Sequence, residues 1–561
     1  MAGKRAVQRG GRHAGRRSDA RRRARRHAVL GGAALAFCAA TVVTATQLTG
    51  GGDPDTGGPS GVTAGEQPPA ASAQEGPRSP SPSPRARPAP EPRVIPAVRA
   101  WEPGRGPGWE PGEDSRVVAD PAGPLADEAR RLAGELGIDA SGGPARAGDV
   151  ELAVDPGADG GREAYTLTTG DGRVRITGSA EAGVFYGTRT LLQTVRDRGY
   201  VSEGEVRDRP DRPQRGLLID TARKHFPADW IEDRVREMAD LKLNQLHLHF
   251  ADDQGFRIES DSHPEIVSEQ HLTKDEVRGI IDLARSLHVT VVPEIDSPGH
   301  LGAVLKAHPD LQLRDAGGDP VRGAIDITDP RAAGLVDELL DEFAPLFPGR
   351  YFHLGGDEYA PLLRADPAAS FPALQRAAVR AHGPQARIED LATAWLNDRA
   401  ATVTGHGKTP QVWNDGMHAD GAVEPSGNRQ VTYWTGREIG AREPVSYLEE
   451  GWDLLNLNSR YLYYVLGEPN EFTYPTGEAI YEEWTPDVLR GSEPVPARYA
   501  NADRIPGGRF AVWCDLSGAQ STAEVAEGIR LPLAATAQKL WDPAEPELSW
   551  SRFTELADRV D

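Results

Sequence analysis

Two adjacent carboxylates, Asp357 and Glu358, form the most specific chemical pattern in this chain. They end residues 351–358 (YFHLGGDE), in which the paired glycines allow the backbone to turn tightly where a ligand must come close. Neighbouring acids in an apolar pocket do not both ionise cheaply, so one is pushed towards the protonated state while the other stays charged. The pair is therefore suited to acid catalysis at a glycosidic bond, provided that the fold places it in a pocket.

The elements that must position this pair follow a regular rhythm. From Arg215 onwards, short apolar strands alternate with amphipathic helices, which is the pattern of parallel βα units. Eight parallel strands with outer helices form a (β/α)8 TIM barrel, an α/β fold whose active site lies at the carboxyl ends of the strands. The predicted strands are 215–220, 244–250, 290–295, 351–354, 409–413, 430–434, 453–458 and 510–514, and the clearest helices are 229–241, 274–287, 331–343, 388–402 and 523–540.

Polar or aromatic side chains stand at the end of nearly every predicted strand. A turn or capping role explains any one of them taken alone, but their recurrence at so many strand ends favours a shared site. They are Asp220, Arg223, His247, His249, Asp252, Glu294, Asp296, Asp357, Glu358, Trp413, Asn414, Asp415, Trp434, Asn458, Trp513 and Asp515.

The residues before the barrel predict a small α+β domain at 93–212, which leaves 213–561 for the catalytic barrel. A helix-like segment at 126–136 is followed by alternating strands at 164–168 and 173–177, and Asp171-Gly172 lies in the hairpin turn between them. A second helix at 183–194 closes the domain.

The N-terminus predicts export. Residues 1–48 are an expected arginine-rich signal peptide or membrane anchor, because ten arginines are followed by about 20 uncharged, mostly apolar residues. Residues 49–92 are rich in Pro, Gly and Ser and contain no aromatic residue, so we expect a disordered linker. The expected location is extracellular, either secreted or anchored by the N-terminal segment to the outer face of the cell membrane.

Length, composition and charge exclude several classes. The 561 residues are too many for a single small binding module, and the mean hydropathy of −0.50 fits a globular protein rather than a multi-span membrane protein. The net charge is −21, and the first 27 residues carry +10, so the remaining residues together carry −31. This acidic part of the chain should repel nucleic acid. The two cysteines, Cys38 and Cys514, form no disulfide framework.

From about Val94 to Trp541, the order of the motifs resembles that of the glycoside hydrolase family 20 β-N-acetylhexosaminidases. No obligate protein partner or cofactor is implied, and the implied substrates are β-N-acetylhexosaminide glycans. The motifs that carry the resemblance are Arg215-Gly216 with Asp220 and Arg223, residues 243–249 (LNQLHLH) with 252–257 (DDQGFR), residues 292–300 (VPEIDSPGH) and the Asp357-Glu358 motif.

The resemblance implies a retaining exo-glycosidase with substrate-assisted catalysis, in which the 2-acetamido oxygen of the sugar attacks the anomeric carbon and an oxazolinium intermediate forms. Glu358 would protonate the leaving oxygen and then activate water. Asp357 would bind the acetamido N–H and stabilise the positive charge. The remaining implied roles are sugar hydroxyl binding by Arg215 and Asp515, support of the acid by Asp252, His300 and His353, and walls for the sugar and its acetamido methyl from Trp413, Trp434 and Trp513.

Three positions depart from the commonest family pattern. Where many members have Tyr-Leu-Asp, this chain has Tyr461-Leu462-Tyr463-Tyr464, so either Tyr463, which we favour, or Tyr461 would contact the acetamido carbonyl. Near the C-terminus, Asp515 replaces a frequent glutamate, and Phe256 replaces a frequent tryptophan. These changes are similar to the branch of streptococcal surface β-N-acetylglucosaminidases and lacto-N-biosidases, which leaves GlcNAc, GalNAc and lacto-N-biose open as the sugar released.

Two other classes compete with this interpretation. His247 and His249 at one strand end could be metal ligands of a barrel amidohydrolase, but the middle strands offer Trp413, Asn414 and Trp434 where further His or Lys ligands would be needed. A non-catalytic glycan-binding barrel would be expected to lack a catalytic carboxylate, whereas Asp357 and Glu358 are both present. We therefore expect a metal-independent hydrolase.

Overall fold

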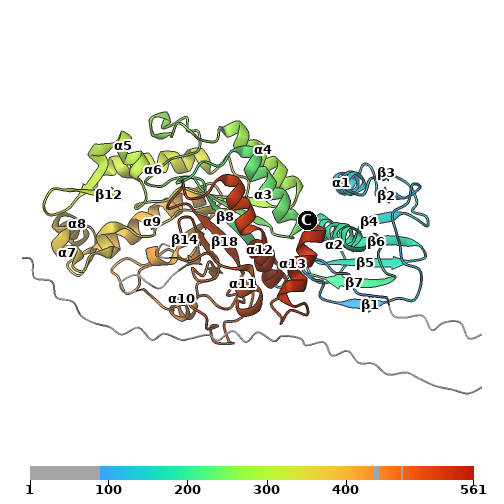
Figure 1. Cartoon of the computed structure of the whole chain (residues 1–561). Coiled ribbons are helices and arrows are strands. Elements are labelled where there is room, and N and C mark those ends of the chain that lie inside the picture. The colour runs from blue at the N-terminus through green and yellow to red at the C-terminus, as the bar shows by residue number, and fades with distance from the viewer. Residues whose placement is uncertain (1–88, 435–440, 469–471) are drawn as a thin grey trace, which may run out of the picture. The chain divides into compact units, whose positions relative to one another are not determined.

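Eight parallel strands close into a barrel in the order β8-β9-β10-β13-β14-β15-β16-β18, and β18 pairs back onto β8 (Figure 1). The computed structural model describes residues 89–434, 441–468 and 472–561. The predicted (β/α)8 barrel is confirmed, with all eight strands at the predicted positions. Their bounds are β8 (Gln214–Asp220), β9 (Gln245–His249), β10 (Thr290–Glu294), β13 (Tyr351–His353), β14 (Thr409–Trp413), β15 (Gln430–Tyr433), β16 (Leu454–Asn456) and β18 (Gly507–Trp513).

A short additional strand, β17 (Tyr463–Val465), was not predicted and pairs with the second half of β18. The first half of β18 pairs with β16 at Gly507 and Gly508. β18 is therefore paired with β16 at its amino end and with β17 at its carboxyl end, so β17 lies between β16 and β18 at the carboxyl end of the barrel.

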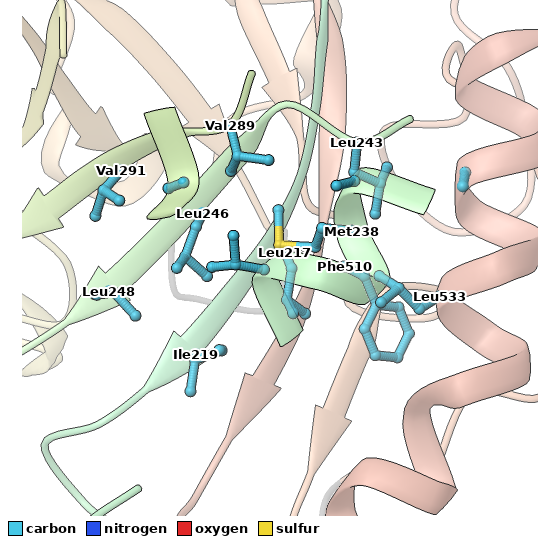
Figure 2. Close-up of a cluster of buried hydrophobic side chains, with 14 of the residues drawn as sticks. Leu217, Ile219, Met238, Leu243, Leu246, Leu248, Val289, Val291, Phe510 and Leu533 are labelled. Carbon is cyan, nitrogen blue, oxygen red and sulfur yellow. The ribbon is translucent and has the colours of Figure 1, made fainter. Parts of the chain in front are cut away.

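Alternation along each strand separates an apolar outer layer from a polar interior. Leu217 and Ile219 of β8 and Leu246 and Leu248 of β9 face outwards and pack against helix residues such as Met238 (Figure 2). The residues between them face the barrel axis. The interior consequently contains buried polar side chains, including Gln245, His247, His249, Glu294, His353, Gln411 and Arg509.

Helices surround the barrel and bury their apolar faces against the outer layer. The capping box of Thr273 and Glu276 fixes the start of α4, and that of Ser521 and Glu524 fixes the start of α12. The helices are α3 (Ala228–Asp240), α4 (Lys274–Ser286), α5 (Gly302–Ala307), α6 (Pro330–Phe343), α7 (Pro367–Ser370), α8 (Pro372–His382), α9 (Ile388–Gly405), α10 (Pro444–Glu450), α11 (Gly477–Glu483), α12 (Thr522–Trp541) and α13 (Trp550–Val560). Shorter elements are η1 (Pro264–Ile266), η2 (Pro309–Leu311), η3 (Ala360–Leu363), η4 (Asn414–Gly416) and the hairpin β11 (Gln312–Arg314) with β12 (Pro320–Ile325).

The residues before the barrel form a mixed sheet with two helices, as expected of an α+β domain. Its predicted hairpin turns at Asp171 and Gly172, where both φ angles are positive, 51° and 70°. The strand order is β1-β7-β5-β6-β4-β2-β3. The bounds are β1 (Trp101–Pro103), β2 (Arg116–Val118), α1 (Ala126–Leu136), β3 (Asp139–Ser141), β4 (Val150–Val154), β5 (Tyr165–Gly170), β6 (Arg173–Gly178), α2 (Glu181–Arg198) and β7 (Gly204–Asp208).

The predicted signal peptide or anchor at 1–48 and nearly all of the predicted linker at 49–92 lie outside the described residues. Among the helices of the described part, none has the length and apolar character needed to cross a bilayer.

Candidate active site

The two predicted catalytic carboxylates lie on a sharp turn that directly follows β13. Gly355 and Gly356 have φ angles of 67° and 100°, and Glu358 itself has a φ of 46°, in the left-handed region that is unfavourable for most residues. A Cβ atom at Gly355 would lie 1.6 Å from Oδ1 of Asp296. A glycine is therefore required at this position for the turn to bring Asp357 against Asp296.

His300 lies between the catalytic pair and a third carboxylate. Its Nε2 is 3.4 Å from Oε2 of Glu358 and 3.5 Å from Oδ2 of Asp357, while its Nδ1 is 3.2 Å from Oδ2 of Asp252. Burial alone would lower the pKa of His300, but Asp357 and Asp252 outweigh burial and raise it well above its ordinary value. The hydrogen bond from His300 in turn lowers the pKa of Glu358. Of the two residues predicted to support Glu358, His300 contacts it directly, and Asp252 acts on it through His300.

A buried polar chain continues from Asp252 into the barrel interior. Nε2 of His249 is 3.3 Å from Asp252, and its Nδ1 is 2.8 Å from Oε2 of Glu294. The Glu294 carboxylate also lies 3.0 Å from His353 and accepts a 2.8 Å hydrogen bond from the Trp413 indole. One buried carboxylate therefore holds His249, His353 and Trp413, which come from three different strands.

The two histidines considered as amidohydrolase metal ligands both lie in this interior network. Nδ1 of His247 lies 3.0 Å from the Arg509 guanidinium, and its Nε2 lies 3.0 Å from Glu294. The cation at Arg509 opposes the approach of a metal ion to Nδ1. His249 is held between Asp252 and Glu294.

Asp296 and Asp357 form a buried acid pair that shares its surroundings. Burial raises the pKa of Asp296 to about 8, while the nearby His300 opposes the rise, and burial followed by Asp296 raises the pKa of Asp357 well above its ordinary value. Oδ1 of Asp296 is fixed by a 2.9 Å hydrogen bond from the Gly356 N–H. At least one of these two carboxyls is therefore protonated near neutral pH.

Replacing Asp296 with asparagine should make the stability of the protein less dependent on pH. The folded carboxyl of Asp296 holds a proton that the unfolded carboxyl releases above 3.8, so wild-type stability is lost as pH rises from about 4 to the folded pKa of about 8. Asparagine mimics the protonated acid and does not titrate. The Tm of Asp296→Asn minus that of the wild type, measured at intervals across this window, should grow with pH and level off above it. A difference that is constant from pH 4 to 8 would contradict the raised pKa of Asp296.

Aromatic residues form a wall beside the carboxylates. The Tyr463 ring stacks on Trp434 with centroids 5.8 Å apart and planes 4° apart, and Trp513 lies 5.9 Å from both Tyr463 and Trp413. Burial, followed by Asp357, raises the pKa of the Tyr463 hydroxyl well above its ordinary value, so it remains a proton donor. The three predicted tryptophans and Tyr463 are thus brought together.

Of the two tyrosine candidates, Tyr461 lies elsewhere. Its hydroxyl donates a 2.9 Å hydrogen bond to Oε2 of Glu483 on α11, and its ring lines a separate cavity. Tyr461 lies in the turn before β17, whereas Tyr463 is the first residue of that strand, so the alternation of the strand does not govern the direction of Tyr461. The preference for Tyr463 as the residue beside Asp357 agrees with this geometry.

The prediction that Arg215 binds the sugar is wrong. Arg215 is fully buried at the amino end of β8, away from the barrel mouth, where its guanidinium donates to Glu163 of the preceding domain at 2.8 and 3.1 Å. The missed residue is Arg223, which follows the carboxyl end of β8, contacts Asp220 and Asp252 at 3.0 and 2.7 Å, and lies 5.4 Å from the centre of the Trp513 ring. The same strand carries both arginines, and only Arg223 lies at the mouth, so the rule that sites lie at carboxyl ends could have identified it.

Opposite effects are expected when the two arginines are exchanged for glutamine. Arg223→Gln should lower kcat/KM by roughly 10- to 100-fold, because hydrogen bonds from a charged donor are lost at the mouth. Arg215→Gln should instead lower the free energy of unfolding by about 3–5 kcal/mol, because Glu163 is left as an unpaired, largely buried charge. Thermal denaturation and steady-state kinetics per folded molecule separate the two. A larger loss of kcat/KM in Arg215→Gln than in Arg223→Gln would contradict the assignment.

Two cavities flank the carboxylates and the aromatic wall. One, of about 390 Å³, is lined by Glu358 and Asp415, and Asp415 accepts hydrogen bonds from the Glu358 N–H at 2.9 Å and the Trp434 indole at 3.0 Å. The other, of about 590 Å³, borders the opposite side and is lined by Trp434, Arg460 and Tyr461 among others. Asp515 is exposed beyond the end of β18, where it interacts electrostatically with Arg223. The arrangement offers a charged acid pair, a cationic donor and aromatic faces around solvent-accessible space.

Both folded parts of the chain match models of known protein families. The model described as "Glycosyl hydrolase family 20, catalytic domain" matches residues 213–544, and "Glycosyl hydrolase family 20, domain 2" matches residues 91–209. Among curated proteins, the chain is 28% identical over 474 residues to a lacto-N-biosidase of Bifidobacterium bifidum, which covers 83% of this chain and 41% of that protein. It is 26% identical over 413 residues to a beta-hexosaminidase of Vibrio furnissii, which covers 66% of this chain and 63% of that protein. The chain thus spans less than two thirds of the length of these relatives.

The solved structures that match this chain are also beta-hexosaminidases, and the match covers a larger share of each of those proteins. Streptomyces plicatus N-acetyl-beta-hexosaminidase in complex with Thio-NAglucal superposes with a TM-score of 0.68 at 25% identity, covering 84% of this chain and 95% of that one. The GH20 beta-N-acetylhexosaminidase from Streptomyces coelicolor has a TM-score of 0.67 at 25% identity, covering 84% and 96%.

Proposed function

Because the chain belongs to glycosyl hydrolase family 20, whose catalytic-domain model matches residues 213–544, we propose that it is a retaining exo-glycosidase that releases terminal β-linked N-acetylhexosamine from glycans or chitooligosaccharides. The observation that carries this proposal is the state of Asp357. Its Oδ1 is buried and receives no hydrogen bond from an N–H group among the described residues, although the carboxyl contacts that of Asp296. A buried acceptor of this kind calls for a ligand donor, and the acetamido N–H of the sugar supplies one.

In the first step, the acetamido oxygen of the substrate attacks the anomeric carbon while the bond to the leaving oxygen breaks. The Glu358 proton passes to that oxygen, and the 390 Å³ cavity beside Glu358 receives the leaving group. The Asp357 carboxylate accepts the acetamido N–H and stabilises the positive charge that develops on the oxazolinium. The Tyr463 hydroxyl, which remains protonated, is placed to donate to the acetamido oxygen.

In the second step, water attacks the anomeric carbon and opens the oxazolinium ring. Glu358, now ionised, takes the proton from that water and is restored as the acid. Two displacements at one carbon retain its configuration, and no protein nucleophile is consumed. His300 assists both steps, because its contacts to Glu358 and Asp357 place one positive charge between the two carboxylates.

A second candidate is the release of a disaccharide from the non-reducing end, as the name of the Bifidobacterium bifidum relative describes for that protein. The 590 Å³ cavity beside Trp434 favours it, because Tyr461, Phe472 and Tyr474 give that cavity the aromatic faces on which sugar rings stack.

The experiment that tests the proposal compares release of 4-nitrophenol from its β-GlcNAc, β-GalNAc and β-lacto-N-bioside derivatives by the same preparation. Turnover of a monosaccharide derivative supports the exo-hexosaminidase. Turnover of the lacto-N-bioside alone moves the assignment to the second candidate. A folded protein that binds these sugars and turns over none of them contradicts both and leaves a glycan-binding barrel.

Residues 1–48 support a further part of the proposal, that the enzyme acts outside the cell, either secreted or held at the outer face of the membrane by this segment. Detection of the activity in the culture medium or on intact cells tests the location.

A further inference from the structure

A cluster of two histidines and a glutamate lies outside the catalytic site, on the loops that follow β9 and β10. His263 precedes η1, Glu265 lies within η1, and His308 joins α5 to η2. We propose that His263, Glu265 and His308 bind a divalent transition-metal ion of the Zn²⁺ class, which braces the catalytic loops. The ion takes no part in the reaction proposed above.

The ligand atoms already lie close to the separations that such an ion requires. Oε1 of Glu265 is 3.1 Å from Nδ1 of His263 and 2.9 Å from Nε2 of His308, and the three atoms lie within 4.8 Å of one another. Ligands bonded at about 2.0–2.1 Å in a tetrahedron are roughly 3.3 Å apart. The two distances to Glu265 therefore need to lengthen by a few tenths of an ångström, and the two imidazole nitrogens, which lie within 4.8 Å of each other, must come to a similar separation.

A fourth residue, Glu338 on α6, completes the arrangement from outside. Its Oε2 lies 3.0 Å from Nε2 of His263, the ring nitrogen that faces away from Glu265. The contact is not aligned as a hydrogen bond in this structure. A carboxylate at this place can accept from Nε2 once the ring turns towards a metal ion, as in carboxylate–histidine–zinc groups, and it then leaves Nδ1 free to act as a ligand.

The donor set selects the class of metal. Two imidazoles and one carboxylate suit Zn²⁺ and its neighbours, whereas Mg²⁺ and Ca²⁺ prefer sites built from oxygen ligands alone. Glu265 is 44% exposed and His308 28% exposed, so water can fill the remaining coordination position. Because protons and metal compete for the same nitrogens, binding should weaken at acid pH.

The position of the cluster connects it to the catalytic loops. Helix α5 begins two residues after His300, and its Gly302 and Ala303 N–H groups donate to Asp253 and to the backbone of Asp252. His308 follows the other end of this six-residue helix, about 9 Å away at the helical rise of 1.5 Å per residue. An ion at His308 therefore joins the loop of Asp252 to the loop of His300 through a second attachment.

The test uses the untagged full chain, stripped with EDTA and dialysed, and then titrated with Zn²⁺ by calorimetry at neutral pH. We expect one equivalent to bind with micromolar or lower Kd and to raise the Tm. His308→Gln keeps a polar group beside Glu265 but not an imidazole, and should weaken binding at least 10-fold and abolish the rise in Tm. Glu338→Gln should weaken binding about 10-fold or more. His406, which pairs with Asp341 at 2.7 Å, provides the control His406→Ala, which should bind as the wild type does.

Stoichiometric uptake that is equal in wild type, His308→Gln and His406→Ala would overturn the proposal, because the metal would then bind elsewhere. Absence of uptake by a folded wild-type protein would also overturn it. Neither result affects the glycosidase proposal, whose tests are turnover of chromogenic substrates.

Discussion

Replacing Glu358 with glutamine is expected to lower kcat/KM for a β-linked N-acetylglucosamine disaccharide by about 10³- to 10⁴-fold, the upper part of the range for general acid catalysis. The leaving group of this substrate is a sugar alkoxide, which departs only with a proton. Glutamine occupies the same space beside His300 and Asp415 but has no proton to transfer. The loss should be much smaller for a 2,4-dinitrophenyl glycoside, because its leaving group departs without protonation.

The comparison of leaving groups distinguishes loss of the acid from general damage to the site. Glu527→Gln on the exposed face of α12 makes the same chemical change away from the barrel mouth and should leave both values of kcat/KM unchanged. Circular dichroism and Tm confirm the fold of each variant. An equal fractional loss for both leaving groups, or near-native turnover of the disaccharide, would show that Glu358 is not the acid.

In the free enzyme, the electrostatics of Glu358 oppose its role as the acid. Its pKa is lowered chiefly by the hydrogen bond from His300, so the carboxyl is ionised when the site is open to water. The side chain is 44% exposed, and a bound sugar would cover it. Removal of that water raises the pKa of a carboxyl, so substrate binding itself favours the protonated form that the first step requires.

The positions of the strands could be predicted because each one is a short apolar run between amphipathic helices. The polar residues that end each run then indicated the carboxyl end of the barrel. The role of Arg215 was taken from the motif resemblance instead and was wrong, although the predicted strand at 215–220 already placed Arg215 at its amino end. Arg223, eight residues further, was identified only as part of the strand-end group. The structure distinguishes the two by partners: Glu163 at the amino end, and Asp220 with Asp252 at the mouth.

The polar interior was beyond prediction for a different reason. His247 and Glu294 were read as separate strand residues, and Arg509 lay outside the predicted strand at 510–514, because neither spacing nor motif shows which side chains of neighbouring strands share a layer. The register does show it: His249 is paired with Glu294, and Glu294 with His353. Likewise, the contact of Glu265 with His308 joins residues 43 positions apart along the chain, and no local pattern indicates it.

Replacing Asp357 with alanine is expected to lower kcat/KM by about 10²- to 10³-fold, as does removal of one group that stabilises charge in a transition state. The predicted loss is nearly the same for the disaccharide and for the dinitrophenyl glycoside. Asp357 acts on the acetamido group, whose attack is required whichever group departs, whereas Glu358 acts on the leaving oxygen.

Two further measurements test this separation of roles. Asp319→Ala, an exposed acid on the β11–β12 turn, controls for the loss of one negative charge and should be close to wild type. Asp357→Ala should also lose its preference for substrates with an intact 2-acetamido group over fluorinated acetamides, because an acetamido group that is poorly positioned attacks slowly whatever its basicity. Leaving-group dependence as steep as that expected for Glu358→Gln would contradict the assignment, since both acids would then be acting at the same oxygen.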